Sequence, residues 1–312
     1  MVGTTDQDQP LKPTVFKDRP RVAILGSKGR LGAALTHLWR PVAEILPYCR
    51  EKLDISRLQD VEKLVTRIPC EFVINCTGLT NVDNCENDPK EAFLLNASSP
   101  ALMARICSAR GIHFIHFSTD YVFDGKHPKL LTEEDPAQPI SHYGSSKLEG
   151  EMEVLRAGQT ALRVSWVFGP DKPSFVDQIL QRALTEDQIE AVADKTSCPT
   201  YTHDLAEWMK IFLSNEIKGN LFHLCNSGAC SWREYGQHAI DCALEYGMPL
   251  KARRVLPLKM DEVRAFKAKR PCHTAMSTGK FAALWGQPLR SWKDAVREYV
   301  RIFKAHQELE VR

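Results

Sequence analysis

The chain has 312 residues, 41 of them basic and 39 acidic, so its formal net charge at pH 7 is only +2. This length exceeds one ordinary hydrophobic core and predicts either two lobes or one large α/β domain. A charge so close to balance excludes a global pull toward nucleic acid or an anionic membrane surface. No stretch is long and apolar enough to span a bilayer. We therefore expect neither nucleic acid nor a membrane as a partner.

The N-terminus and the cysteines point to an intracellular protein. Residues 1–20 contain three prolines and many polar side chains but no apolar run, so they predict a flexible tail and not a signal peptide. The ten cysteines show neither paired zinc spacing nor the framework of a small disulfide-rich domain. We expect reduced thiols, no metal site and a cytoplasmic location.

Strand and helix patterns alternate along the first half of the chain. A short apolar run over 21–25 ends in Gly26 and is followed by a helical pattern over 31–39. The pattern then predicts a strand over 72–76, a helix over 89–110, a strand over 113–118, a helix over 142–155 and a strand over 161–168. Such alternation predicts an α/β fold with a doubly wound parallel sheet that has helices on both faces.

The alternation of strands and helices becomes less regular after residue 168. Residues 169–200 predict an excursion with a helix over 175–184, after which a helix over 204–213 and a strand over 221–224 return to the sheet. We assign 21–168 plus about 201–225 to the domain built on this sheet. The remaining parts, about 169–200 plus 226–312, form the expected smaller C-terminal lobe.

A glycine-rich segment, GSKGRLG, lies directly after the first strand and directly before the first helix. Its spacing, Gly-x-x-Gly-x-x-Gly, is a variant of the dinucleotide fingerprint, in which glycines allow a tight turn and close approach of the backbone to a pyrophosphate. Glycine-rich turns are common, but this position makes the segment a cofactor site. The candidate cofactor-binding residues here are Gly26, Lys28, Gly29, Arg30, Leu31 and Gly32.

The end of the second strand bears on the choice of cofactor. That strand is expected to end near Tyr48 or Cys49, where a carboxylate would bind the ribose 2′-hydroxyl of NAD. Cys49 is not an acid and Arg50 follows it, which favours NADPH while NADH remains allowed. Arg50 could equally be a solvated surface residue, and Glu51 could serve NAD if the register differs by two. Asp54 is placed near the adenine.

Small and polar residues follow the third and fourth strands, at the sheet edge where a cofactor crosses a parallel fold. A plain small-residue turn or a helix cap would use the same residue types. Their place between the glycine segment and the helix over 142–155 favours the functional interpretation. The cofactor candidates are Cys76, Thr77, Gly78, Thr80 and Ser118, and the substrate candidates are Thr119, Asp120 and Tyr121.

Tyr143 and Lys147 are four residues apart in a predicted helix and therefore share one face. A tyrosine beside an ammonium suits a proton donor, and lowering a phenol pKa from near 10 toward 7 takes roughly 4 kcal/mol of differential stabilisation. We expect Lys147 to supply it, and both residues to touch the cofactor. His113, His116 and His142 are interpreted as structural.

The order of eight motifs resembles the extended short-chain dehydrogenase/reductases and, within them, the dTDP-4-dehydrorhamnose reductases. The motifs are GSKGRLG, NCTGLTNVD, LLNASSPALM, FSTDYVFDG, YGSSKLEGE, RVSWVFG, DKTSCPTYT and KRPCHTAMST. The resemblance implies that the domain over 21–168 plus about 201–225 is an NAD(P)-binding Rossmann domain and that the smaller lobe binds the substrate. It further implies a catalytic trio of Thr119, Tyr143 and Lys147, with Trp166 near the sugar. It also implies NAD(P)H-dependent reduction of the 4-keto group of a nucleotide sugar, with dTDP-4-dehydro-L-rhamnose as the expected substrate, and allows for a homodimer.

The chain departs from the family pattern at several positions. The family usually has Gln and Gly where Lys195 and Ser197 stand, Thr and Tyr where Val164 and Phe168 stand, and often an acid at Cys49. These departures leave the exact sugar and the cofactor preference open.

The basic segment 251–270 mostly predicts a solvated face, but Lys269 or Arg270 could bind an anionic substrate. We expect the lobe to grip the substrate diphosphate by charge, through Lys195, Ser197 and the pair Lys269 and Arg270, with Arg270 as the substrate-binding candidate.

Two relatives with other functions resemble the same pattern. Related dehydratases carry an acid directly after Thr-Asp, or a Thr-Glu pair, but here Thr119 and Asp120 are followed by Tyr121, which favours simple ketone reduction. The regulatory β-subunit of methionine adenosyltransferase also resembles this family and binds a partner enzyme. A weakly catalytic or non-catalytic NADP-binding module is therefore the alternative from a different class, as is a ketoreductase for another nucleotide sugar.

Overall fold

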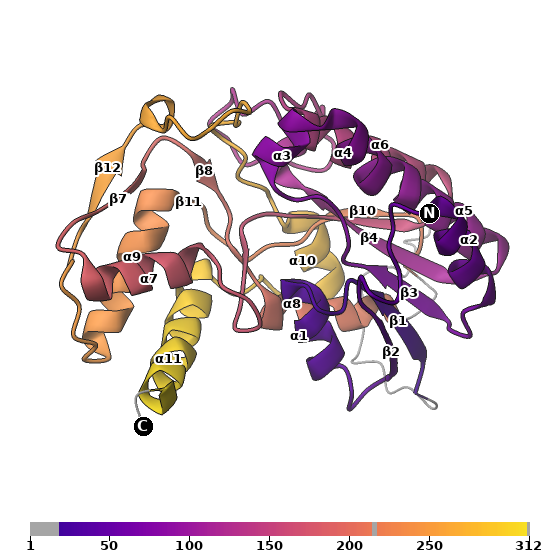
Figure 1. Cartoon of the computed structure of the whole chain (residues 1–312), viewed down its shortest axis with the longest axis horizontal. Helices are drawn as coiled ribbons and strands as arrows, with labels where there is room; N and C mark the ends of the chain where they lie inside the picture. The colour runs from indigo at the N-terminus through magenta and orange to yellow at the C-terminus, as the bar shows by residue number, and fades with distance from the viewer. Residues whose placement is uncertain (1–18, 214–216, 311–312) are drawn as a thin grey trace, which may run out of the picture.

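The structure is a computed structural model of the chain and describes residues 19–213 and 217–310. Figure 1 shows two parts, a larger one built around a central sheet and a smaller one that holds the C-terminal helix. The predicted N-terminal tail lies outside the described residues except for its last two positions. The larger part contains the strands assigned to the predicted Rossmann domain, and the smaller part contains most of the segments assigned to the predicted lobe.

The central sheet has six strands in the order β10-β5-β4-β3-β1-β2. All neighbouring pairs in it are parallel. The strands are β1 (Arg21–Leu25), β2 (Glu44–Tyr48), β3 (Phe72–Asn75), β4 (His113–Thr119), β5 (Thr160–Val164) and β10 (Leu221–His223). The crossover order confirms the doubly wound parallel sheet, and the return of the chain through β10 confirms the predicted strand over 221–224.

Helices cover both faces of the sheet, and the inner strands β1, β3, β4 and β5 are buried along almost their whole length. In β1, Val22 and Ile24 pack with helix α1 (Arg30–Leu38), whereas Ala23 and Leu25 pack with the opposite helices. Those opposite helices are α2 (Leu58–Arg67), α5 (Ser99–Ala109) and α6 (His142–Arg156). Helix α8 (Thr202–Trp208) and the 3₁₀ turn η3 (Met209–Leu213) lie beside α1.

The predicted helix over 89–110 is divided in three. It consists of α4 (Pro89–Phe93), a π-helical turn η1 (Leu94–Ser98) and α5. The extra residue of a π turn redirects side chains, and here it turns Asn96 fully inward. Gly150 of α6 makes room for this turn, since a Cβ there would lie 2.0 Å from the carbonyl oxygen of Asn96. The periodicity of the segment gave no sign of the interruption.

The predicted strand over 161–168 is also interrupted. Strand β5 stops at Val164, and β6 (Val167–Phe168) pairs instead with β9 (Thr200–Tyr201). Between them Trp166 adopts the left-handed region, with φ 41°. The prediction of one strand was wrong because the hydroxyl of Thr200 donates to the Ser165 carbonyl at 2.6 Å and fixes a bend there.

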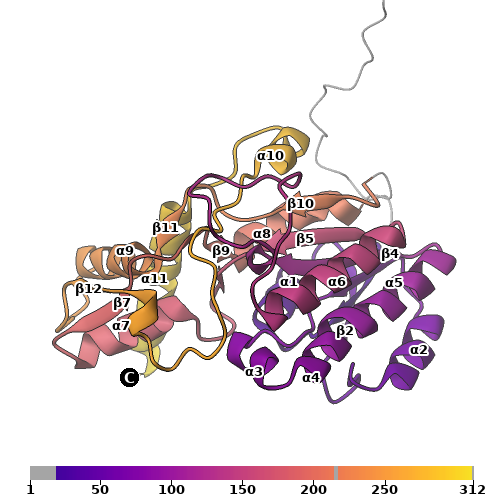
Figure 2. The same cartoon turned by 90° about the horizontal axis from the view of Figure 1, so that it is seen from above.

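The smaller lobe has its own core of aromatic and aliphatic side chains. Its elements are α7 (Phe175–Thr185), β7 (Ile189–Val192), β8 (Thr196–Ser197), β11 (Cys230–Ser231), α9 (Trp232–Glu245), β12 (Val255–Leu258), η4 (Met260–Glu262) and α11 (Trp292–Glu310). Helix α10 (Gly279–Trp285) differs from the sequence assignment because it packs on the large sheet, where Phe281 contacts Phe212 and Phe222. Figure 2 shows α10 beside β10 and apart from α7, α9 and α11.

Candidate active site

A cavity of about 510 Å³ opens at the carboxyl ends of β1, β3, β4 and β5, where the lobe meets the sheet. Ligands of doubly wound folds bind at this edge. The predicted residues that line it are Gly29, Arg30, Leu31, Cys76, Thr77, Gly78, Thr80, Ser118, Thr119, Asp120, Tyr121, Tyr143, Lys147 and Trp166. The structure thus brings together residues from five separate motifs. Gly26, Lys28, Gly32, Arg50, Asp54 and Arg270 lie outside this lining.

The glycine segment forms the turn from β1 into α1. Gly26 has φ 79°, and a Cβ there would lie 3.0 Å from the carbonyl oxygen of Cys76. Gly32 packs against the same turn, since a Cβ on it would lie 2.2 Å from the Gly26 carbonyl oxygen. Helix α1 has Gly29 as its N-cap, with no side-chain cap and no acid in its first turn. Its first N–H groups therefore remain available to an anion at the cavity.

Two cationic side chains of this segment are held by the protein itself. The Arg30 guanidinium donates to the carbonyl oxygens of Val167 and Lys172, both at 3.2 Å, and also to that of Pro173. It therefore ties α1 to the chain that enters the lobe. Lys28 forms an ion pair with Glu51 at 2.8 Å, with both side chains largely exposed. The Lys28 contact is of the kind that contributes little to stability.

The segment after β2 lies outside the cavity. The turn places it near the glycine segment, because the N–H groups of Gly26 and Ser27 donate to the Tyr48 carbonyl at 2.8 and 3.1 Å. Arg50 is exposed just beyond this strand. Asp54 accepts from the N–H and hydroxyl of Ser56, and these bonds hold the pKa of its carboxyl below the ordinary value.

The loop after β3 is shaped by a buried amide. The Asn96 side chain accepts from the Leu79 N–H at 2.8 Å and donates to the Leu79 carbonyl at 3.0 Å and to the Ser146 hydroxyl at 3.1 Å. Gly78 lies next to this amide and has φ 148°. A Cβ at Gly78 would lie 2.8 Å from Asn96 Oδ1. Sequence reasoning missed Asn96, because it lies within what looked like a regular helix.

The end of β4 carries three polar side chains. The Ser118 hydroxyl is buried and has no hydrogen-bond partner within the described parts of the chain. Thr119 Oγ1 lies 3.2 Å from both the Tyr121 N–H nitrogen and Asp120 Oδ1. Asp120 is 1% exposed and accepts from the hydroxyls of Ser197 at 2.8 Å and Thr274 at 2.5 Å. These two hydroxyls hold the Asp120 side chain in place at the cavity wall.

Tyr143 stands in the first turn of α6, whose N-cap Ser141 accepts from the Gly144 N–H at 3.2 Å. Its ring meets the edge of Tyr121, with centroids 5.4 Å apart. Burial raises the pKa of Tyr143 above its ordinary value, and a hydrogen bond with the Thr119 side chain partly offsets this rise. The expected lowering of the phenol pKa toward 7 was therefore wrong for this structure, because burial outweighs it. The phenol keeps its proton, as a proton donor must.

Lys147 lies one turn further along α6 and is almost fully buried. Its Nζ donates to the Phe117 carbonyl and lies 3.3 Å from His116 Nε2. Burial lowers the pKa of Lys147 to about 8. His116 is buried, as expected, but it contacts a predicted catalytic residue.

Trp166 lines the cavity and packs against aromatic side chains of the lobe. Trp166 stacks on Tyr235, with centroids 6.1 Å apart, and lies 5.6 Å from the Trp232 ring. Its indole Nε1 is buried and has no partner within the described residues. Trp166 can therefore offer a hydrogen bond to a bound molecule.

The cationic side chains of the lobe that were predicted to bind a diphosphate form contacts within the protein instead. Arg270 pairs with Asp83 of α3 (Val82–Asn87) at 2.6 Å and stacks over the Phe266 ring at 3.6 Å. Lys195 is fully buried, and its Nζ donates to the Pro271 carbonyl at 2.7 Å. The expectation for Lys195 and Ser197 was wrong, because both side chains are buried in contacts within the protein. Substrate binding by Arg270 stays a prediction.

Several lining residues were missed by sequence reasoning. They are Val82, Phe117, Val164, Ser165 and Val167. All are close neighbours of predicted residues at the ends of β3, β4 and β5, so strand position was the available signal. Thr274, which bonds Asp120, offered no such signal because it comes from a distant segment.

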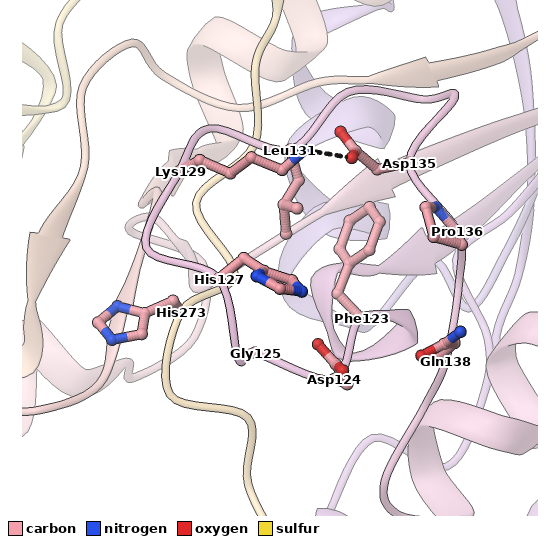
Figure 3. Close-up of a pocket in the computed structure, with 10 residues that line it drawn as sticks. All are labelled: Phe123, Asp124, Gly125, His127, Lys129, Leu131, Asp135, Pro136, Gln138 and His273. Atoms are coloured by element: carbon pink, nitrogen blue, oxygen red, sulfur yellow. Dashed lines mark hydrogen bonds and ion pairs between the residues drawn. The ribbon is translucent and has the colours of Figure 1, made fainter.

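A second cavity, of about 420 Å³, lies along residues 123–138. Phe123, Leu131 and His127 point toward its centre, whereas His273 points away (Figure 3). Lys129 on its rim is paired with Asp135 at 2.6 Å. It contains none of the predicted catalytic or cofactor residues, so the larger cavity is the candidate active site.

The described residues contain neither a metal-binding cluster nor a membrane-spanning helix. Within residues 19–213 and 217–310, no three His, Cys, Asp or Glu side chains gather as a metal site. No helix in those residues could cross a membrane. All ten cysteines are free.

Comparisons with known proteins agree with the resemblance in the motifs. The family described as RmlD substrate binding domain matches residues 20–305. A dTDP-4-dehydrorhamnose reductase of Sinorhizobium fredii is 32% identical over 293 residues, which cover 90% of this chain and 96% of that protein. The reductase of Mycobacterium tuberculosis is 32% identical and matches 88% of this chain and 91% of its own length.

Solved structures give the same result. The dTDP-4-dehydrorhamnose reductase of Bacillus anthracis, solved in complex with NADP, superimposes with a TM-score of 0.83 at 28% identity, over 91% of this chain and all of that chain. Bordetella bronchiseptica WbmG with NAD is 17% identical, with a TM-score of 0.75 over 93% of this chain and 95% of its own, and shows the likeness of fold alone. The predicted family is confirmed.

Proposed function

Because the chain belongs to the RmlD family, whose relatives include dTDP-4-dehydrorhamnose reductases, we propose that it reduces the 4-keto group of a dTDP-linked deoxy sugar with NADPH. The most specific substrate is dTDP-4-dehydro-L-rhamnose, which would become dTDP-L-rhamnose. The observation that carries the proposal is the meeting of Thr119, Tyr143 and Lys147 in the same cavity as the glycine turn.

The residues present fit a dinucleotide. The uncapped N-terminus of α1 presents backbone N–H groups to the cavity, and Gly26 leaves space that a Cβ would fill. The unpartnered hydroxyl of Ser118 lies in the same wall. The turn at Gly29, Arg30 and Leu31 would hold the pyrophosphate, and Lys147 would hold the ribose beside the nicotinamide. The nicotinamide supplies the hydride.

Other side chains of the cavity donate the proton, orient the carbonyl oxygen and contact the sugar. Tyr143 donates its proton to the carbonyl oxygen as hydride reaches the carbon, and its burial keeps that proton in place until then. Thr119 orients the same oxygen. Asp120 and Tyr121 border the sugar, and Trp166 offers its free indole N–H to it.

The preference for NADPH rests on Arg50. It follows β2, where relatives of this fold bind the 2′ position of the adenine ribose, and its exposed guanidinium is free to meet a phosphate. Cys49 gives NADH no carboxylate in the same place. NADH is therefore the weaker alternative.

A screen of keto-sugar nucleotides tests the proposal. Purified protein should oxidise NADPH only when a 4-keto-sugar nucleotide is present, and most rapidly with dTDP-4-dehydro-L-rhamnose. Each mixture would be checked for the alcohol product by mass spectrometry. If NADPH bound but no keto-sugar nucleotide were reduced, a regulatory, partner-binding role would replace this one.

We also place the protein in the cytoplasm as a homodimer. Ten free cysteines support a reducing compartment. Met152 of α6 is 43% exposed and borders a hollow that Phe93 and Leu148 also line, which suits contact with a second copy. Light scattering on wild type and Met152→Glu would test the dimer; two monomeric species would rule it out.

A further inference from the structure

A chain of buried polar side chains runs behind Lys147. Asn75 ends β3, His116 lies in the middle of the neighbouring β4, and Lys147 reaches His116 from α6. Asn75 and His116 are fully buried and Lys147 is 4% exposed. Asn75 Nδ2 lies 3.1 Å from His116 Nδ1, and His116 Nε2 lies 3.3 Å from Lys147 Nζ. No step of the ketoreductase reaction requires the first two residues directly.

The backbone fixes which way the Asn75 amide faces. The N–H of Thr77 can only donate, and it lies 3.1 Å from Asn75 Oδ1. The Thr77 hydroxyl approaches the same oxygen at 2.5 Å. Because Oδ1 is held there, the NH₂ group of Asn75 must face His116 and donate to Nδ1.

The Asn75 amide in turn fixes the tautomer of His116. Burial lowers the pKa of His116 well below its ordinary value, so the ring is neutral and carries one hydrogen. Since Nδ1 accepts from Asn75, that hydrogen is on Nε2, which faces Lys147. Phe114 stacks on the ring with planes 6° apart and holds it in this orientation.

The Nε2–H group of His116 disfavours the charged form of Lys147. An ammonium has three hydrogens and no lone pair, so it cannot accept from His116, whereas a neutral amine can. We propose that Asn75 and His116 are positioning residues that act through Lys147: the tautomer they fix controls whether the Lys147 amine is charged. The inference takes the role of Lys147 from the proposed function, but its geometry is independent of the substrate.

Some of the other groups around Lys147 favour its charged form, and others oppose it. Burial opposes the ammonium, and the buried Cys85 thiol of α3 stays neutral because burial raises its pKa to about 11. Glu151, one turn further along α6, favours the ammonium but is paired with Arg163 at 2.6 Å. Tyr143, on the turn before, is a neutral phenol.

The balance of these groups leaves Lys147 with a pKa of about 8. A lysine in water titrates near 10.4 and would stay charged throughout the physiological range. Lys147 instead changes its charge within about one pH unit of neutrality, where the ribose and Tyr143 would respond to it. Among its neighbours, His116 is the one whose replacement should change the pKa of Lys147 most.

The test measures the titration of Lys147 directly. Protein labelled with ¹³C at the lysine ε-carbon would be titrated by NMR, and the Lys147 signal would be assigned from its absence in Lys147→Met. His116→Gln can present a carbonyl oxygen to Lys147 in place of the Nε2–H group. Its Lys147 titration should move upward by roughly one pH unit or more, because the ammonium gains an acceptor.

Two controls separate this effect from a general disturbance of the core. His113→Gln changes another buried histidine of β4, whose Nε2 contacts the Thr160 hydroxyl at 2.8 Å, and should leave Lys147 unmoved. Lys195 is also fully buried with a pKa lowered to about 8, and its signal should be the same in His116→Gln as in wild type.

Asn75→Leu gives a second route to the same result without adding a charge. It removes the donor to Nδ1 of His116, so the hydrogen of the neutral ring can lie on Nδ1 and Nε2 becomes an acceptor for Lys147. Lys147 should again titrate at higher pH, also if His116→Gln fails to fold. An unmoved Lys147 in the folded variants, or an equal shift in His113→Gln, would overturn the proposal. Failure of every keto-sugar assay would not affect this result.

Discussion

Arg270 of the lobe and Asp83 of α3 form an ion pair at 2.6 Å that joins the two parts of the chain beside the active-site cavity. Asp83 also accepts from the backbone N–H groups of Lys267 at 2.9 Å and Ala268 at 3.0 Å. One carboxylate thus fixes the lobe segment that precedes Pro271. The Arg270 side chain is 8% exposed, so solvent screens this pair less than a surface pair.

Breaking this contact should loosen the lobe and weaken substrate binding. Asp83→Asn and Arg270→Ala are each expected to lower the free energy of unfolding by about 1–3 kcal/mol. Both should raise KM for the nucleotide sugar and leave cofactor affinity unchanged. Arg182→Ala, which breaks an exposed pair with Glu186, is the matched control. If Asp83→Asn left KM unchanged while Arg270→Ala raised it, Arg270 would bind substrate itself.

The same pair predicts a dependence on acid. Arg270 and the backbone donors hold the pKa of Asp83 well below its ordinary value. A carboxyl with a lowered folded pKa stabilises the fold above its unfolded pKa, near 4, and loses that contribution as pH falls below it. Urea unfolding from pH 7 to 3 should therefore show a steeper loss of stability for wild type than for Asp83→Asn. Parallel curves would contradict the assignment.

Removing the phenol of Tyr143 should abolish most activity without affecting the fold. Tyr143→Phe is expected to lower kcat at least about 100-fold, because a general acid contributes that much or more. NADPH affinity should change little. Tyr246→Phe removes a hydroxyl that contacts the Arg297 carbonyl far from the cavity and serves as the control. A near wild-type rate in Tyr143→Phe would show that another group donates the proton.

The parts of the fold that were predicted are those that depend on local patterns. Strands with apolar runs and the glycine turn after β1 follow from spacing, and the residues at the carboxyl ends of β3 and β4 had to meet because parallel strands end together. Tyr143 and Lys147 share a face because a helix repeats every 3.6 residues. These rules involve residues close in sequence or fixed by the sheet.

The parts that were missed depend on contacts between distant segments. The inward turn at Asn96 exists because it meets Gly150 and Leu79, and the bend at Trp166 exists because Thr200 bonds to the strand before it. Lys195 resembled a free cation in the sequence but is buried against the Pro271 carbonyl. No local pattern reports such partners.

Cofactor preference should respond to Arg50. Arg50→Ala is expected to weaken NADPH binding by about tenfold or more, because a charge-assisted contact with phosphate is lost, and to leave NADH affinity nearly unchanged. Fluorescence titration with both reduced cofactors measures this. Arg57→Ala, seven residues further on, is a control for loss of one positive charge. Tighter binding of NADH than of NADPH by wild type would contradict the proposal outright.

Lys195 should make stability depend on alkaline pH. Burial lowers the pKa of Lys195 to about 8, whereas the unfolded chain holds the proton up to about 10.4. Between these values the unfolded state binds more protons, so wild type should gain stability as pH rises, by about 1–3 kcal/mol from this group. Lys195→Met lacks the titrating amine and fills the same space, although the Pro271 carbonyl loses its donor.

The test therefore compares how the free energy of unfolding changes with pH in the two proteins, and not its absolute value. Urea unfolding of wild type and Lys195→Met would be measured from pH 7 to 10. The difference in free energy of unfolding, wild type minus variant, should rise across this range, because wild type gains stability there and Lys195→Met does not. Lys147 titrates in the same window but is present in both proteins, so its contribution cancels. A difference that stays constant with pH would mean that Lys195 keeps its ordinary pKa and that its burial is offset by the Tyr121 ring, 4.6 Å from Nζ.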